Sequence, residues 1–169
     1  FLAALAMVFL RGRSRGQVAW VAASAPLLGL ALLAWMTPAV LQGWVPDAHH
    51  AWIPQIGLDF DLRLDGLAWM FAGLVLAIGA LVVMYAHYYL SSEDSAPRFF
   101  GCLLLFMGSM LGVVIAGNLL LLMVFWELTS ISSFLLIGFW YKRQDAREGA
   151  RMALAITGGG GLALLGGVL

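Results

Sequence analysis

The sequence predicts an all-α integral membrane protein with about six transmembrane helices and one short strand or hairpin on the outer surface. Of its 169 residues, 63% are hydrophobic and only 11% are charged, and the mean hydropathy is +0.95. A water-soluble domain of this size needs more polar side chains to cover its core. The apolar residues also fall into long runs, and a helix needs about 20 of them to cross a bilayer. The composition therefore excludes a soluble enzyme.

The apolar runs define the expected spans in chain order. The first run is long enough for only half a bilayer, so we interpret it as the end of a truncated helix. In the second run, Pro26 is expected to bend the helix because proline cannot donate a backbone hydrogen bond. The expected spans are residues 1–10, 17–41, 66–90, 99–116, 118–141 and 146–169.

The one long connection, residues 41–64, contains an alternating pattern. Apolar residues with a period of two predict a strand or hairpin arm that lies on the membrane surface with one apolar face. Pro54 and Asp65-Gly66 bound it. The alternating apolar residues are Ile56, Leu58, Phe60, Leu62 and Leu64.

Only Gly117-Asn118 separates the fourth and fifth spans. Such a short connection predicts a tight turn, in which Asn118 caps the following helix. The two spans are therefore expected to be antiparallel neighbours.

The basic residues indicate the orientation of the spans. If Phe1 lies outside, eight of the nine Lys and Arg residues fall on the inner side, as the positive-inside rule requires. We expect a multi-pass protein of the cell inner (plasma) membrane in contact with the lipid bilayer. The basic residues form short clusters and no stripe, so a nucleic acid partner is not expected. The inner residues are Arg11, Arg13, Arg15, Arg98, Lys142, Arg143, Arg147 and Arg151, and Arg63 is the outer one.

The sequence offers no convincing metal or cofactor site. Cys102, the single cysteine, lies inside an apolar run and is interpreted as a small core residue. His49 and His50 lie beside Asp47 in the outer connection, but without further ligands they would form at most a weak metal site.

Glu127 is the one charged residue that falls in the middle of an expected span. It lies about 13 Å along the helix from the turn at Asn118, near the bilayer midplane. A charge at this depth costs about 2.5 kcal/mol or more, and such residues mark ion or proton pathways. We predict proton translocation at Glu127. The alternative is a structural carboxylic acid, kept neutral by a hydrogen bond to Thr129 or to a neighbouring helix. No Lys or Arg of these residues reaches that depth, so a paired cation must come from elsewhere.

Several polar residues are candidates for a pathway around Glu127. Ser130 and Ser133 follow it on the inward side and could hold water, and Thr129 is adjacent. The alternative, which we favour, is that these hydroxyls bond to backbone carbonyls. His87, among tyrosines at an inner helix end, could relay protons, although an interfacial histidine needs no such role.

The run of four glycines at 158–161 has two interpretations. It could mark a broken helix at an ion site, as in some transporters. We favour the second interpretation, in which the glycines let packed helices approach closely.

The segment FWELTSISSFLLIGFWY at 125–141, with LLLFMGSMLGVV at 103–114 and LDGL at 64–67, resembles the antiporter-like membrane subunits shared by multi-subunit Mrp-type sodium/proton antiporters and respiratory complex I. The resemblance covers about residues 58–169 and is closer to the Mrp branch. It implies that the chain is the N-terminal transmembrane portion of such a subunit, working without a cofactor in a hetero-oligomer with other antiporter subunits. A glutamate at the position of Glu127 pairs, in this family, with a lysine on a later, interrupted helix, which is expected beyond Leu169. An acidic residue often precedes the asparagine of the outer turn, whereas this chain has Gly117.

The resemblance implies exchange of protons for sodium or a similar monovalent cation, and therefore a transporter rather than an enzyme. One alternative is the proton-pumping membrane subunit of an NADH:quinone oxidoreductase, which would use the same Glu127. A second alternative is a structural membrane scaffold.

Overall fold

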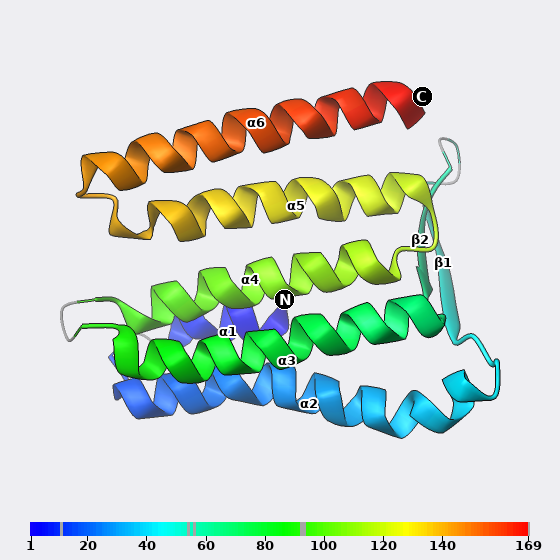
Figure 1. Ribbon diagram of the computed structural model, residues 1–169, viewed down its shortest axis with the longest axis horizontal. Coiled ribbons are helices and arrows are strands. Elements are labelled where there is room, and N and C mark those ends of the chain that lie inside the picture. Colours follow the sequence, from blue (N-terminus) through cyan, green and yellow to red (C-terminus); the bar gives the residue numbers. More distant parts are fainter. Residues whose placement is uncertain (11, 54, 56, 92–93, 169) are drawn as a thin grey trace.

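The computed structural model describes all residues except 11, 54, 56, 92–93 and 169. Its described part holds six α-helices, one short 3₁₀ helix and a two-stranded antiparallel sheet (Figure 1), which confirms the predicted fold class. In chain order the elements are α1 (Leu2–Phe9), α2 (Arg15–Leu41), β1 (Asp47–Ile53), β2 (Leu58–Arg63), α3 (Gly66–Tyr89), α4 (Ala96–Ile115), α5 (Leu119–Ile137), η2 (Gly138–Trp140) and α6 (Gln144–Val168).

Five of these helices, α2 to α6, are long and apolar enough to cross a membrane. The eight-residue α1 is not. The helices lie side by side, and the hairpin sits at one end of the bundle, on the right of Figure 1. Many large apolar side chains are exposed on the helices, among them Trp20, Trp35 and Leu162. A surface of this kind is suited to lipid and not to water, which supports a multi-pass membrane protein.

Three helices begin with the side-chain caps that their sequences suggest. Ser14, Asp65 and Asn118 each accept a hydrogen bond from a backbone N–H in the first turn of α2, α3 and α5. Because a cap satisfies an otherwise unpaired donor, these residues fix where the helices begin. The predicted turn with Asn118 as cap is therefore confirmed, and α4 and α5 pack against each other.

Two helix bounds differ by three or more residues from those expected. The fourth helix starts at Ala96, three residues before the expected start, because Pro97 is tolerated in a first helical turn. The fifth α-helix ends at Ile137 and not at Tyr141, since Gly138 begins a 3₁₀ turn that tightens the chain before it reverses.

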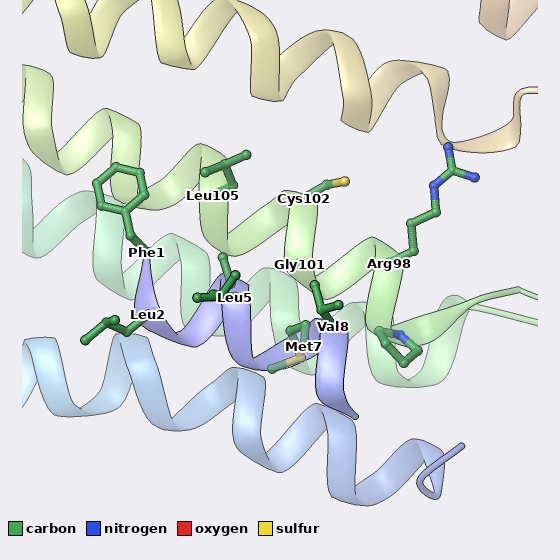
Figure 2. A pocket seen from close by; sticks show the side chains of 11 residues that line it. Phe1, Leu2, Leu5, Met7, Val8, Arg98, Gly101, Cys102 and Leu105 are labelled. Atoms are coloured by element: carbon green, nitrogen blue, oxygen red, sulfur yellow. The ribbon is translucent and has the colours of Figure 1, made fainter. Parts of the chain in front are cut away.

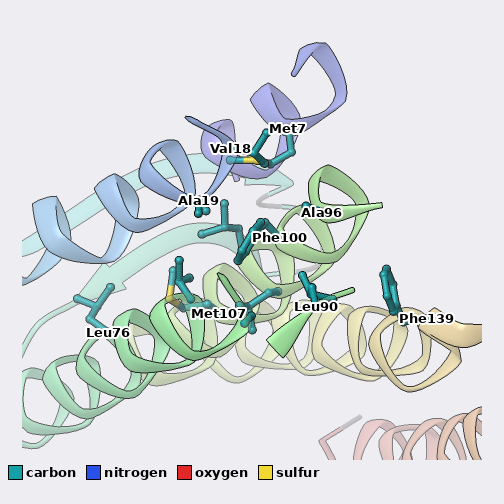
Figure 3. Close-up of a cluster of buried hydrophobic side chains, with 14 residues drawn as sticks. Met7, Val18, Ala19, Leu76, Leu90, Ala96, Phe100, Met107 and Phe139 are labelled. Atoms are coloured by element: carbon teal, nitrogen blue, oxygen red, sulfur yellow. The ribbon is translucent and has the colours of Figure 1, made fainter. Parts of the chain in front are cut away.

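A cluster of buried hydrophobic side chains lies mainly between α1, α2, α3 and α4 (Figure 3). Phe100 and Val18 are fully buried there, and Met7 and Val83 are 1% exposed. Two glycines admit large side chains from neighbouring helices: Gly79 lies against Met107, and a Cβ on Gly112 would overlap the ring of Phe125. Packing this close is common where membrane helices associate.

The hairpin docks onto the turn between α4 and α5. The Gly117 N–H donates to the Asp61 carbonyl oxygen at 2.7 Å, and Asn118 Nδ2 donates to the Asp59 carbonyl oxygen at 2.8 Å. A Cβ on Gly117 would lie 2.6 Å from the Asp61 carboxyl carbon. The Asp61 carboxyl group therefore occupies the space that a side chain at residue 117 would need.

The predicted hairpin is present, but its alternating burial is not. Phe60 is 39% exposed, whereas Asp59 and Asp61 are partly buried, because the strand docks through its backbone on the helix turn. Pro54 and Ile56, which were expected to bound and begin the pattern, lie outside the described residues. His49 and His50 are exposed on β1, and the described residues contain no group of three His, Cys, Asp or Glu that could hold a metal ion.

Candidate functional site

Glu127 is the ninth of the 19 residues of α5, midway along the helix. The Asp, Glu, Lys and Arg residues of the other described helices all lie within the first eight residues of α2, α4 or α6. The carboxyl group is thus isolated in the apolar middle of the bundle, where a charge is most costly.

The Glu127 side chain points toward α6. A Cβ built on Gly161 would overlap Glu127 Oε1 and lie 2.9 Å from its carboxyl carbon. Gly161 is buried, and Trp126 Cδ1 would lie 3.5 Å from the same Cβ. The carboxyl group therefore occupies space that exists because residue 161 has no side chain.

The other three glycines of the run do not share this role. Around Gly158, Gly159 and Gly160 no atom lies within 4 Å of a built Cβ. The run does not break the helix, since α6 continues from Gln144 to Val168. Of the four glycines, only Gly161 therefore lies in close contact with a neighbouring helix.

Glu127 Oε1 is buried and has no hydrogen-bond partner within the described part of the chain. The ion pairs seen among the described residues, Arg63–Asp65 at 3.8 Å and Arg143–Asp145 at 2.9 Å, lie in the connections or at a helix end. A buried polar oxygen without a partner is costly and rare in native proteins. Such an atom needs a partner, and the described part of the chain does not supply one.

The hydroxyl groups near Glu127 are engaged with the backbone. Thr129 Oγ1 and Ser130 Oγ both donate to the Trp126 carbonyl oxygen, at 2.6 and 3.3 Å. Ser132 Oγ, which is fully buried, donates to the Leu128 carbonyl oxygen at 2.7 Å. Ser133 lies one turn beyond Ser130 toward the inner end and is partly buried. The structure thus gives the Thr129 hydroxyl a backbone acceptor, and no hydrogen bond joins it to Glu127.

His87 lies apart from Glu127, near the inner end of α3. It lines a groove of about 660 Å³ between α2 and α3 together with Trp20, Met84 and Tyr88. Its ring packs edge-on against Tyr88, with centroids 5.0 Å apart. Nδ1 is buried and unpaired among the residues that the structure describes.

A second groove, of about 540 Å³, lies between α1 and α4 (Figure 2). Its walls are apolar side chains such as Phe1, Leu5 and Leu105, with Cys102 at one side. The Arg98 guanidinium lies over the ring of Tyr141, at 5.1 Å from its centroid. This groove contains neither Glu127 nor its neighbours.

A cluster of polar hydrogen bonds lies at the end of the bundle opposite the hairpin. Asp94 accepts hydrogen bonds from the Ser91 N–H and hydroxyl and from Trp140 Nε1, each at 3.0 Å. Burial alone would raise the pKa of Asp94, but these hydrogen bonds, with Arg15 nearby, outweigh burial and lower it. Asp94 thus links the α3–α4 connection to η2, the 3₁₀ helix that follows α5.

Two family models match the chain. Residues 52–100 match "NADH-Ubiquinone oxidoreductase (complex I), chain 5 N-terminus", and residues 116–169 match "NADH:quinone oxidoreductase/Mrp antiporter, TM". The second matched region contains Glu127 and the whole of α5 and α6.

Curated relatives are similar over nearly the whole chain. A protein of Rhizobium meliloti (strain 1021), named as a probable A/B-type subunit of a K(+)/H(+) antiporter, is 52% identical over all 169 residues, which are 17% of its own length. The A1-type subunit of a Na(+)/H(+) antiporter from Staphylococcus aureus is 44% identical over 155 residues, or 92% of this chain and 19% of that protein. The chain therefore spans less than a fifth of the length of these relatives.

Two solved structures share the fold. The Mrp complex from Dietzia sp. DQ12-45-1b matches 96% of this chain and 17% of its own chain, with a TM-score of 0.81 and 33% identity. An archaeal respiratory membrane complex, the membrane-bound sulfane sulfur reductase, matches 97% of this chain and 25% of its own chain, with a TM-score of 0.78. Its 20% identity supports likeness of fold alone.

Proposed function

We propose that the chain belongs to the antiporter-like membrane subunits of Mrp antiporters and NADH:quinone oxidoreductases, the proteins that it resembles, and that its function follows from this family. The chain is part of the A-type subunit of an Mrp-type antiporter that exchanges protons for a monovalent cation, and Glu127 carries the proton. The observation that carries this proposal is the buried, unpartnered Glu127 Oε1 midway along α5.

Glu127 can perform this task because its carboxyl group gains or loses a proton with no covalent chemistry. A buried charge without a partner is costly. The proton can therefore leave only when a cationic group or water comes to the carboxylate. A transfer site in a membrane needs such coupling, since it prevents an uncontrolled proton leak.

Among the described residues no Lys or Arg nitrogen lies within ion-pair distance of Glu127. We propose that the pairing cation is a lysine from another part of the complete protein, and that this protein forms a hetero-oligomer with other antiporter subunits in the plasma membrane. Sodium or a similar monovalent cation is the exchanged ion, since the relatives are named for Na(+)/H(+) and K(+)/H(+) antiport. The pathway residues proposed beside Glu127 are Thr129, Ser130, Ser133 and His87.

A second candidate is a proton-pumping membrane subunit of a respiratory complex, favoured by the match of residues 52–100 to complex I chain 5. This pump would use Glu127 in the same way but would take its energy from electron transfer. Cation-driven proton movement in the absence of a redox substrate distinguishes the antiporter from the pump.

The test replaces Glu127 in the full complex, in inverted vesicles that carry a proton gradient, to which sodium or potassium is then added. Glu127→Gln keeps the shape but cannot ionise, so we expect cation-driven proton movement to be lost while the complex still assembles. Glu127→Asp keeps a titratable group one methylene further back and should retain part of the activity. Glu148→Gln makes the same chemical change on an exposed carboxylate of α6 and serves as the matched control.

Normal cation-driven flux in Glu127→Gln would refute the proposal and favour the scaffold alternative. Blotting for the assembled complex accompanies every flux measurement. It ensures that a lost signal is assigned to transport only when the complex is present.

A further inference from the structure

We propose that Gly161 of α6 is a positioning residue for proton transfer, because the space left by its missing side chain holds the Glu127 carboxyl group. This inference rests on the proposed function and adds a residue from a different helix to it. Under this inference α6 contributes a residue to the proton site and does more than pack beside α5.

The geometry at this contact is specific. A Cβ on Gly161 would overlap Glu127 Oε1 itself, and the carboxyl carbon would be 2.9 Å away. Oε1 is one of the two oxygens at which the carboxyl group can take up or release a proton. Gly161 and Ala150 are the two buried residues among the described residues of α6, and Gly161 is the one that lies at this contact.

The other glycines provide an internal comparison. Gly159 and Gly160 are exposed, and a Cβ on either would meet nothing within 4 Å in the described structure. Intrinsic helix propensity favours alanine over glycine equally at all these positions. If Gly161→Ala has a larger effect on flux than Gly159→Ala or Gly160→Ala, the difference therefore comes from the contact with Glu127 and not from helix propensity.

An added methyl group at 161 has two ways to be accommodated. Either the Glu127 side chain rotates away, or α5 and α6 separate. Rotation needs no backbone change, because glutamate has several rotatable bonds. We therefore expect the carboxyl group to be displaced by an ångström or more. Misplacement of a reacting group by about 1 Å can slow a reaction about 100-fold.

The experiment measures cation-driven proton flux of the full complex for Gly161→Ala alone and combined with Glu127→Asp. We expect Gly161→Ala to lower flux by about tenfold or more. Asp withdraws the carboxyl group by one methylene and frees the space that the new methyl needs. In the Glu127→Asp background, Gly161→Ala should therefore change flux by less than about twofold, a non-additivity expected of residues in contact.

Several outcomes overturn the inference. A purely structural glycine predicts the same fold-loss in both backgrounds, because the effects of independent sites add. Equal losses for Gly161→Ala, Gly159→Ala and Gly160→Ala would also overturn it, as would a normal flux in Gly161→Ala. If Gly161→Ala lowers the amount of assembled complex, that amount is compared by blotting between Gly161→Ala alone and Gly161→Ala combined with Glu127→Asp. An amount of assembled complex restored by Glu127→Asp supports the contact, and an amount that stays low overturns the inference.

The result for Glu127→Gln separates this inference from the proposed function. If the glutamine variant transports normally, the proposed function fails and the inference fails with it. If the glutamine variant is inactive while Gly161→Ala is normal, only the role of Gly161 is refuted.

Discussion

Replacing Asn118 should weaken two interactions at the outer end of the bundle, the cap of α5 and the docking of the hairpin, because one side chain makes both. Its Oδ1 accepts the Leu121 N–H at 2.7 Å and caps α5, and its Nδ2 donates to the Asp59 carbonyl oxygen at 2.8 Å and holds the hairpin. Loss of a cap costs about 1 kcal/mol, and loss of one hydrogen bond costs about 1 kcal/mol. Asn118→Ala should therefore lower the local stability by about 2 kcal/mol, half from the lost cap and half from the lost hairpin hydrogen bond.

Amide hydrogen exchange on the intact complex can measure the two interactions separately. The Gly117 N–H reports hairpin docking, since it donates to the Asp61 carbonyl oxygen. The Leu121 N–H reports the cap. Each loss of about 1 kcal/mol corresponds to exchange about fivefold faster. Asn118→Ala should accelerate both amides, whereas Asn118→Ser, which keeps a capping oxygen but does not reach Asp59, should accelerate that of Gly117 alone.

Asp65→Ala is the control, because Asp65 caps α3 through the Ala68 N–H at 2.9 Å. It should accelerate exchange at Ala68 and leave Gly117 and Leu121 unchanged. An unchanged Gly117 amide in Asn118→Ser would refute the reasoning, since the hairpin would then be held without this side chain.

Two further predictions concern other contacts. Gly117→Ala should displace the Asp61 carboxyl and speed exchange of the hairpin amides, and Asp61→Gly in the same chain should reverse the effect; a lack of reversal would contradict the contact. Trp140→Phe removes a donor to Asp94 and should cost about 0.5–1 kcal/mol at pH 7, measured by thermal unfolding of the complex. Because the pKa of folded Asp94 is lowered, its bonds contribute stability above the ordinary Asp pKa and lose it as pH falls through the lowered value. The difference between Trp140→Phe and the native protein should therefore shrink below about pH 4; a constant difference would contradict this assignment.

Local chemistry explains which features could be predicted from sequence. The spans follow from the lengths of apolar runs, and the α4–α5 turn follows from Gly117-Asn118 and the capping preference of asparagine. Glu127 stands out for the same reason, because one acidic residue in an apolar helix needs no three-dimensional information to be noticed.

The contacts of these residues could not be predicted, because they depend on how elements rotate and dock. The glycines at 158–161 are chemically identical, and only the rotation of α6 about its axis selects Gly161 to face Glu127. Asp61 and Gly117 are far apart in the sequence, and no local pattern indicates that a hairpin carboxyl fills the space at the turn. The pattern in β2 also gave the wrong burial, since backbone docking on the turn partly buries Asp59 and Asp61.

The direction in which Glu127 points limits how a proton can reach it. On the other side of α5, buried Leu121 and Phe125 pack toward the bundle, with Phe125 seated against Gly112 of α4. The carboxyl group faces α6, which is mostly exposed outside its contacts at Ala150 and Gly161. If Glu127 carries the proton as proposed, the proton therefore reaches its carboxyl group from the side of α5 that faces α6.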